Sequence, residues 1–343
     1  MNKYIFIITL FCSILFSCQK ESVDDILDET IYVRHQGADM PAYVHGNQEN
    51  KTFLVVIHGA GSFGLSFRDE HFINRLEDDF VVVYFDSRGQ SMSQGHYKKP
   101  ENIINLMASD VSALTKVIKH KYGEDITLFL MGHSLGGLIT GEALINLDLQ
   151  SEYNGWINVD GLLDMPSVKG DRTELLYKTA EEQIDIGNSV SQWKGIQKVL
   201  RDIDIDTEDA HQEILNQAVI AYKLIAEDQV VLGNSSIERT YQTIIKNNPI
   251  TWQAMHLFNR PENYVIDNDY SILNELDQIT IPTKFIYGKY DFSVPPEGGS
   301  DAFRKISSTE KELSIYERSA HHPFISQGGI FVQEVKNFIN QYK

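Results

Sequence analysis

The chain has 343 residues, of which 42% are hydrophobic and 10% aromatic, enough for one large domain with an insertion or for two ordinary domains. Its 48 acidic and 30 basic residues give a formal net charge of −18 at pH 7. That charge argues against nucleic acid as a partner and against a basic membrane-binding face.

The N-terminus has the composition of a targeting segment. Lys3 supplies a positive charge, and residues 4–16 form an almost unbroken apolar run. This run is shorter than the roughly 20 residues that a membrane-spanning helix needs, so a signal peptide over residues 1–17 is predicted.

The end of this segment, Leu15-Phe16-Ser17-Cys18, resembles a bacterial lipobox. The resemblance implies that Cys18 is the lipid attachment site, that residues 18–29 form a tether, and that the protein is anchored to a membrane of the cell envelope. Acidic residues after Cys18 also resemble a signal for the outer surface. The alternative is an ordinary secreted protein with a chance cysteine. If Cys12 leaves with the signal and Cys18 is acylated, cysteine catalysis and disulfides are excluded.

Strand and helix patterns alternate along the first half of the remaining chain. Two strands are predicted at 30–34 and 42–45, joined through residues 37–39. Apolar runs then alternate with helical patterns, which indicates a parallel sheet wound with helices. The predicted strands are 53–57, 80–85, 126–130 and 155–160, and the predicted helices are 67–76, 103–122 and a segment from 138.

The pattern changes between residues 164 and 277. No strand-like apolar run recurs there, and segments such as 174–184 and 207–224 favour helix. An inserted helical cap over 164–277 is therefore predicted, with the core formed by 30–163 and 278–343. The core resumes with strands at 283–288 and 311–316 and closes with a helix over 329–342. Conspicuous cap residues fit the cap's own core better than a substrate pocket, and these are Trp193, Trp252, Met255, His256 and Phe258.

One pentapeptide, Gly132-His133-Ser134-Leu135-Gly136, lies between a predicted strand and a predicted helix. In that context G-x-S-x-G is typical of a nucleophile elbow, in which a tight turn exposes the serine hydroxyl at the end of the strand. A glycine-rich turn without chemical meaning is the alternative, and the flanking elements argue against it.

A second glycine-rich loop, residues 58–64, follows the strand 53–57. A phosphate-binding loop would need a lysine followed by serine or threonine, which is missing here. The loop is therefore interpreted as an oxyanion loop.

Together these features identify a resemblance to the α/β-hydrolase family, whose fold is a mostly parallel, doubly wound sheet. The order serine, aspartate, histidine is the one that this fold uses. The motifs are His58-Gly59-Ala60-Gly61, Asp86-Ser87-Arg88-Gly89, Gly132-His133-Ser134-Leu135-Gly136-Gly137, Tyr287-Gly288-Lys289-Tyr290-Asp291 and Ser319-Ala320-His321-His322-Pro323-Phe324.

The resemblance points to capped serine hydrolases similar to proline iminopeptidases. Those enzymes carry H-G-G-P-G where this chain has His58-Gly59-Ala60-Gly61-Ser62, and Ser91 replaces the glycine expected after D-x-R-G. Cap carboxylates that would bind a substrate amine are not identified by motif. Aminopeptidase activity is thus an alternative to cleavage of a small ester or amide.

The catalytic roles follow from side-chain chemistry. Ser134 needs a base to become a nucleophile, and His321 is assigned as that base because imidazole titrates near neutral pH. Asp291 is expected to hold the imidazole in the correct tautomer. The backbone N–H groups of Leu135 and Ala60 are expected to form the oxyanion hole.

Two alternatives stay open at the triad. His322 is adjacent to His321, and Asp160 follows an earlier strand where some relatives place the acid. A metal site at the histidine pair is not expected, since no further ligands are evident. Asp86 and Arg88 are expected to brace a turn, with Asp110 as a helix cap or pair partner.

The predicted activity is therefore hydrolysis through an acyl-enzyme, without a cofactor or a metal. Transacylases and cofactor-free perhydrolases use the same residues. A lipid-anchored, non-catalytic binding protein on the same scaffold is the rival hypothesis.

Overall fold

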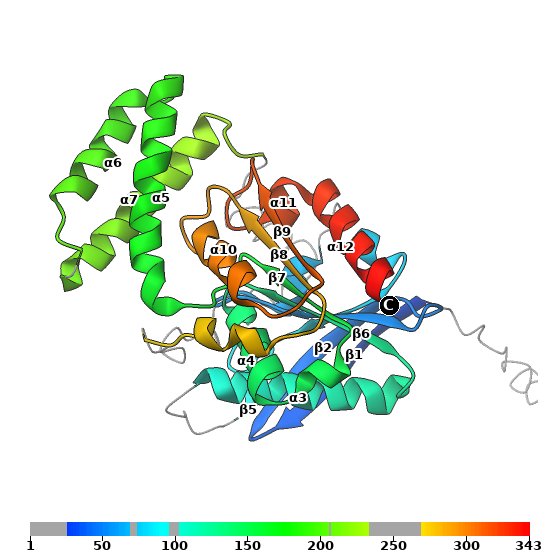
Figure 1. Ribbon diagram of the computed structural model, residues 1–343. Helices are drawn as coiled ribbons and strands as arrows, with labels where there is room; N and C mark the ends of the chain where they lie inside the picture. The colour runs from blue at the N-terminus through cyan, green and yellow to red at the C-terminus, as the bar shows by residue number, and fades with distance from the viewer. Residues whose placement is uncertain (1–25, 69–73, 96–102, 206, 233–268) are drawn as a thin grey trace, which may run out of the picture.

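A mostly parallel sheet crosses the molecule (Figure 1). The computed structural model describes residues 26–68, 74–95, 103–205, 207–232 and 269–343. The strand order is β1-β2-β4-β3-β6-β7-β8-β9, with β5 paired to β2. Strands β1 and β2 are antiparallel to their neighbours, and β3, β4 and β6 to β9 form parallel pairs. The strands are β1 (Ile26–His35), β2 (Ala38–Asn47), β3 (Thr52–Ile57), β4 (Val81–Phe85), β5 (Gln94–Gly95), β6 (Thr127–His133), β7 (Gly155–Val159), β8 (Thr283–Gly288) and β9 (Lys311–Tyr316).

Helices cover both faces of the sheet, as predicted. Helix α12 lies on the side opposite α3 and α4 (Figure 1). Alternate residues of each central strand enter two separate cores, because successive side chains point to opposite faces. In β3, Phe53 and Val55 join the core under α3 and α4, while Leu54 and Val56 join the core under α12. The flanking helices are α2 (Asn74–Glu77), α3 (Ile103–Tyr122), α4 (Leu135–Asn146), α10 (Pro296–Lys305), α11 (Pro323–Ser326) and α12 (Gly328–Tyr342).

The first hairpin is longer than predicted and its turn is shorter. Strands β1 and β2 pair over their whole lengths, from Ile26 with Asn47 to His35 with Ala38. Only Gln36 and Gly37 form the turn, and both have positive φ, 41° and 80°. This is the geometry that suits a two-residue hairpin, so the predicted connection through residues 37–39 is wrong. The predicted tether also ends earlier than residue 29, because β1 begins at Ile26.

Other parts of the prediction differ or lie outside the described residues. Of the predicted helix over 67–76, residues 69–73 lie outside the described residues; Phe67 ends a 3₁₀ turn, Gly64–Phe67, and residues 74–76 belong to the short helix α2. The signal segment, Cys18, Trp252, Met255, His256 and Phe258 lie outside the described residues. Among the residues that are described, no helix is long and apolar enough to cross a membrane.

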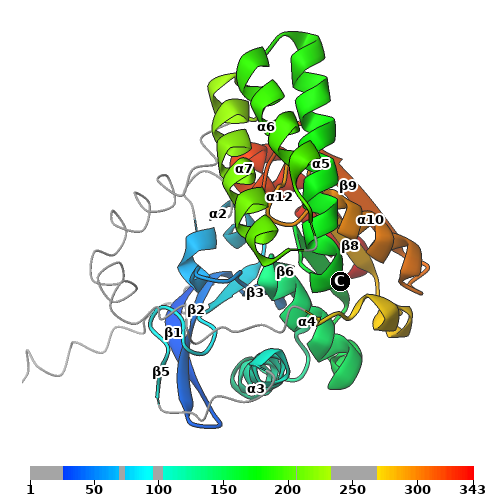
Figure 2. The same cartoon turned by 90° about the vertical axis from the view of Figure 1, so that its left-hand side faces the viewer.

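Between β7 and β8, the residues that the structure describes form three long helices: α5 (Met165–Ile186), α6 (Val190–Asp202) and α7 (Glu208–Glu227). We call them the inserted helices. They rise as a separate group from one end of the sheet (Figures 1 and 2). They share a third apolar core, in which Trp193 is fully buried. The predicted core role of Trp193 is thus confirmed. The boundaries of a cap at 164 and 277 stay a prediction, because residues 233–268 are not described.

A buried ion pair joins the loop after β4 to α3. The Arg88 guanidinium donates from Nε and Nη2 to the two carboxylate oxygens of Asp110, both at 2.5 Å. The two side chains are 0% and 1% exposed. His35 donates from Nδ1 to Asp110 at 2.8 Å. Arg88 therefore braces its turn, with Asp110 as its pair partner.

Replacing Asp110 with Ala leaves this buried guanidinium without its carboxylate. Because an uncompensated buried charge is costly, Asp110→Ala is expected to lower the free energy of unfolding by about 3–5 kcal/mol, measured by urea denaturation. The matched control is Asp39→Ala, which breaks the exposed pair with Arg34 and should cost less than about 1 kcal/mol. Equal losses in the two variants would contradict the structural role of the buried pair.

Candidate active site

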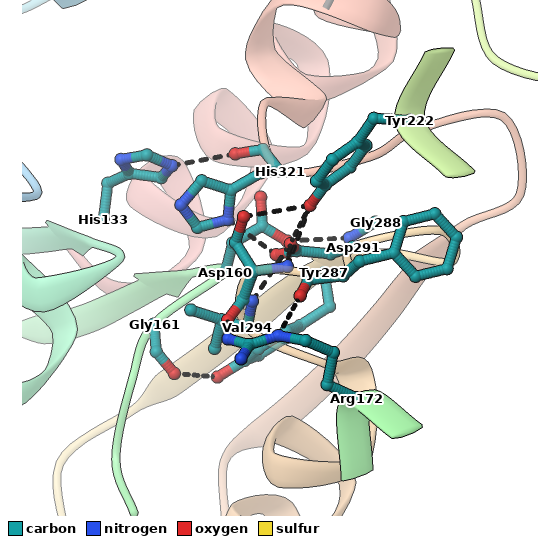
Figure 3. A network of polar contacts seen from close by, with 12 residues as sticks. His133, Asp160, Gly161, Arg172, Tyr222, Tyr287, Gly288, Asp291, Val294 and His321 are labelled. Atoms are coloured by element: carbon teal, nitrogen blue, oxygen red, sulfur yellow. Dashed lines mark hydrogen bonds and ion pairs between the residues drawn. The ribbon is translucent and has the colours of Figure 1, made fainter. Parts of the chain in front are cut away.

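The predicted site residues gather at one edge of the sheet. Ser134, Asp160 and Asp291 follow β6, β7 and β8, and His321 follows β9. Since these strands are parallel neighbours, their carboxyl ends meet at the same edge. Figure 3 shows His321, Asp160 and Asp291 close together.

Ser134 sits in a strained turn between β6 and α4. Its φ of 55° and ψ of −122° are unfavourable for a side chain, and they persist only where the surroundings enforce them. Close packing supplies that constraint. A Cβ at Gly132 would lie 2.3 Å from the Gly136 carbonyl oxygen, and one at Gly136 would lie 2.2 Å from the Ile57 carbonyl oxygen. The elbow predicted from G-x-S-x-G is therefore present in the backbone.

The glycine-rich loop after β3 lies directly against this serine. A Cβ at Gly59 would come within 3.2 Å of Ser134 Oγ. His58 is fully buried, donates from Nδ1 to the Gly59 carbonyl at 2.7 Å and accepts at Nε2 from the Ser87 N–H at 3.1 Å. Burial lowers the pKa of His58 to about 4, so its imidazole is neutral at pH 7. Its two hydrogen bonds connect the loop after β3 to the loop after β4. The Gln90 side-chain carbonyl accepts from the Gly61 N–H at 3.1 Å.

The two remaining predicted triad residues are joined. The imidazole of His321 donates from Nδ1 to Asp291 Oδ2 at 2.7 Å. Asp291 is fully buried, while the His321 side chain is 16% exposed. Two backbone groups, the N–H of Ser293 and that of Val294, donate to Asp291 Oδ1 at 2.8 and 3.0 Å. Because Nδ1 of His321 faces Asp291, Nε2 is the ring nitrogen that can accept a proton from another group.

Three histidine rings lie next to one another at tilted or edge-on angles. The ring centroid of His133 lies 4.8 Å from that of His321 and 5.3 Å from that of His322. His133 donates from Nε2 to the backbone carbonyl of His321 at 2.9 Å, and burial holds its pKa well below the usual range. Desolvation and the neighbouring His321 imidazole lower the pKa of His322 to about 3. Both neighbours of His321 are therefore neutral at pH 7, and the structure pairs His321, not His322, with Asp291.

Asp160 lies beside Asp291 but is held differently. It is fully buried, and Oδ1 accepts from the Gly288 N–H at 2.8 Å. Oδ2 receives no hydrogen bond from a donor among the described residues. Burial, followed by the nearby negative charge of Asp291, raises the pKa of Asp160 well above its ordinary value. Burial beside the Asp291 carboxyl therefore favours the neutral form of Asp160.

The structure also brings together three potential metal ligands. Ligand atoms of His133, Asp160 and His321 lie within 4.8 Å of one another, which the sequence did not indicate. His133 Nε2 bonds to the His321 carbonyl and His321 Nδ1 bonds to Asp291, which leaves the other nitrogen of each ring towards the site. Burial favours the neutral form of Asp160, which is a weaker cation ligand than a carboxylate.

Three polar residues of the site were not found from sequence. Gln90 holds the loop after β3, and Tyr222 and Arg172 reach the loop around Asp291 from the inserted helices. No local pattern marks the two helical residues, since each is an ordinary polar position on a long helix. Their roles depend on packing between residues 69 to 121 positions apart in the chain.

The fold and this arrangement of side chains define an α/β-hydrolase. The family model described as "Serine aminopeptidase, S33" matches residues 48–246, more than half of the chain. The chain belongs to that family, and the protein is an enzyme of the α/β-hydrolase class.

Similar proteins agree with this assignment. The chain is 23% identical over 300 residues to "Probable aminopeptidase YbaC" of Bacillus subtilis, covering 84% of this chain and 89% of the relative. It is 23% identical over 269 residues to the proline iminopeptidase of Saccharolobus solfataricus, covering 76% of each chain. Among solved structures, an esterase from Rhodococcus has a TM-score of 0.58 at 18% identity and covers 93% of this chain and 100% of its own. The proline iminopeptidase of Mycobacterium smegmatis has a TM-score of 0.61 at 16% identity, with 92% and 98% covered. This family and these relatives do not support the non-catalytic alternative.

The raised pKa of Asp160 predicts that the free energy of unfolding depends on pH. Because its pKa is raised in the folded state, the native protein binds more protons than the unfolded chain above about pH 4, and this contribution to stability falls as pH rises. Asp160→Asn keeps a side-chain oxygen that can accept from the Gly288 N–H and has no titrating proton. Its free energy of unfolding is expected to rise relative to wild type from pH 4 towards pH 7, with a limiting slope of about 1.4 kcal/mol per pH unit.

Urea denaturation over this pH range measures the difference. The control is Asp39→Asn, at an exposed carboxyl whose pKa is lowered by the Arg34 guanidinium, and no such gain is expected there. A constant difference between Asp160→Asn and wild type over the whole range would show that Asp160 is ionised in the folded protein.

Proposed function

We propose that this enzyme cleaves a small ester or amide through an acyl-enzyme intermediate on Ser134. The observation that carries the proposal is the His321–Asp291 pair, placed at the same sheet edge as a serine in a strained elbow. Among the described residues, the Ser134 hydroxyl makes no hydrogen bond that would commit its proton elsewhere.

In the proposed acylation step, Ser134 Oγ attacks the substrate carbonyl carbon while His321 Nε2 accepts the hydroxyl proton. The tetrahedral intermediate collapses as the bond to the leaving group breaks, and His321 returns the proton to the departing oxygen or nitrogen. Water then attacks the acyl-enzyme in the same way and releases the acid and free Ser134. Asp291 stabilises the imidazolium in both steps because its buried negative charge faces Nδ1.

The proposed oxyanion hole uses the N–H groups of Leu135 and Ala60. Leu135 is the first residue of α4, so its N–H has no partner within the helix and points to the helix N-terminus. Ala60 lies in the loop that His58 and Gln90 hold beside Ser134. Loss of one such donor costs about 3 kcal/mol of transition-state stabilisation in serine hydrolases.

Aminopeptidase activity is a second candidate, favoured by the names of the two relatives that match most of the chain. It requires a carboxylate that binds the substrate's free amine. Glu182 of α5 is one carboxylate near the site loops, but its Oε1 already lies 3.1 Å from Lys289 Nζ and accepts the Tyr290 hydroxyl at 3.0 Å. A panel of p-nitrophenyl esters and aminoacyl arylamides separates the two activities.

The catalytic proposal is tested with Ser134→Ala. Removal of the nucleophile is expected to abolish labelling by a fluorophosphonate probe and to reduce turnover of the best panel substrate at least about 1,000-fold. Ser109→Ala on α3, whose hydroxyl only contacts the Leu106 carbonyl, is the matched control and should behave as wild type. Labelling that survives in Ser134→Ala would refute the assignment.

The same assay separates the two histidines. His321→Ala should lose turnover to a similar degree, because no base then contacts Asp291. His322→Ala should retain far more activity, since its low pKa makes it a poor proton acceptor at pH 7. The reverse result would move the base to His322.

We further propose that the protein is anchored to a bacterial envelope membrane by a lipid on Cys18. The apolar run at 4–16 and the Leu15-Phe16-Ser17-Cys18 motif support this. Cys18→Ala is expected to move the protein from the membrane fraction to the soluble fraction, measured by immunoblot after ultracentrifugation, with Cys12→Ala as the control that stays bound. Membrane retention of Cys18→Ala would rule out this anchor.

A further inference from the structure

The inserted helices and the site loops share one apolar core. Besides side chains of α5, α6 and α7, that core contains Tyr290 and Phe292, which flank Asp291, and Ala320, which precedes His321. Phe292 is fully buried, and its ring packs edge-on against Tyr222 of α7 with centroids 5.0 Å apart. The loops that carry the acid and the base are therefore packed against the inserted helices as well as attached to the sheet.

Tyr222 makes direct polar contact with the acid. Its hydroxyl donates to Asp291 Oδ1 at 3.0 Å and accepts from the Ser293 N–H at 2.8 Å. It also lies 3.0 Å from the Ser293 hydroxyl. Figure 3 shows Tyr222 approaching Asp291 from the inserted helices, on the side away from Gly161. Burial, with the nearby negative charge of Asp291, raises the pKa of Tyr222, so it stays a hydrogen-bond donor at neutral pH.

Arg172 of α5 holds the next two residues of the same loop. Its guanidinium donates from Nε to the Phe292 carbonyl at 2.5 Å and from Nη2 to the Ser293 carbonyl at 2.9 Å. The arginine is only 6% exposed. Because the guanidinium is planar, two bonds to adjacent carbonyls fix the direction of the loop, which a lysine could not do.

We propose that the inserted helices position the catalytic acid, with Tyr222 and Arg172 as positioning residues for Asp291. This inference rests on the proposed function, in which Asp291 orients His321. Oδ1 of Asp291 is occupied by Tyr222 and two backbone N–H groups, so Oδ2 is directed to His321 Nδ1. Neither positioning residue touches the reacting atoms.

Arg172 and Tyr222 link the position of the inserted helices to the position of the acid loop. Any displacement of α5 or α7 relative to the sheet must break or carry along the contacts of Arg172 and Tyr222 with residues 291–293. A change in the position of the inserted helices is therefore transmitted to the carboxylate that faces the base.

The test is Tyr222→Phe, which keeps the ring packing against Phe292 and removes only the hydroxyl. We expect kcat to fall about 10- to 100-fold, because a hydrogen bond to a charged group is lost, while KM changes less than about twofold. The pKa of His321 should rise, since the negative charge of Asp291 is then concentrated on the oxygen that faces the imidazole. That rise appears in the acidic limb of the kcat/KM profile and in an NMR titration of the His321 ring.

The matched control is Tyr153→Phe. Tyr153 is also buried, and its hydroxyl contacts Thr115 Oγ1 at 2.7 Å, but it precedes β7 at the opposite end of that strand from Asp160. It should lose stability without a change in the pH profile. Wild-type kcat and an unshifted His321 titration in Tyr222→Phe would overturn the inference.

Arg172→Lys is a second variant, which keeps the positive charge and removes the two-pronged contact. A drop in kcat at unchanged KM supports the inference, and wild-type kcat contradicts it. The NMR titration needs no turnover, so it decides the positioning role even if fluorophosphonate labelling shows that the proposed reaction is wrong.

Discussion

The site depends on one buried negative charge. Asp291 has no exposure to water, and a carboxylate in that position is tolerated only when hydrogen bonds replace its hydration. The replacement comes from three parts of the chain: the backbone of its own loop, Tyr222 of α7 and His321 after β9. The same bonds that solvate the charge also fix its direction, so stability and catalytic geometry have a common physical cause.

The histidines near that charge have lowered pKa values, because burial disfavours the charged imidazoles of His58, His133 and His322, and burial raises the pKa of Asp160. The charged guanidinium of Arg172 also lies close, but it binds the backbone carbonyls of Phe292 and Ser293. A cation bonded to the Asp291 carboxylate itself would compete with His321 in a medium of low dielectric constant. Among these imidazoles, a positive charge is therefore stabilised best on His321, which faces Asp291.

The family match and the solved structures agree on the fold. We expect substrate specificity to differ between members of the family through their inserted helices. Identities of 14–18% to solved structures with TM-scores of 0.55–0.62 show that the scaffold tolerates nearly complete change of sequence. In this chain the inserted helices contact the acid loop through Tyr222 and Arg172.

The sequence by itself determined the alternation of strands and helices, because buried parallel strands are continuous apolar runs and their helices repeat every 3.6 residues. The strands 283–288 and 311–316 and the helix 103–122 agree with the structure residue for residue. Local glycine patterns also predicted the elbow at Ser134, whose turn geometry depends on residues next to it. The hairpin at residues 36–37 was misjudged, since only pairing with a partner strand shows where a strand ends.

Only the tertiary structure decided which neighbours act together. Adjacent residues such as His321 and His322 carry the same side chain, and their distinct contacts arise from the direction of each ring towards Asp291. Asp160 and Asp291 look alike in sequence, but burial beside Asp291 raises the pKa of Asp160, whereas Asp291 bonds to the His321 imidazole. Tyr222 and Arg172 carry no local signal, because their partners lie 69 to 121 positions away and are set by helix packing alone.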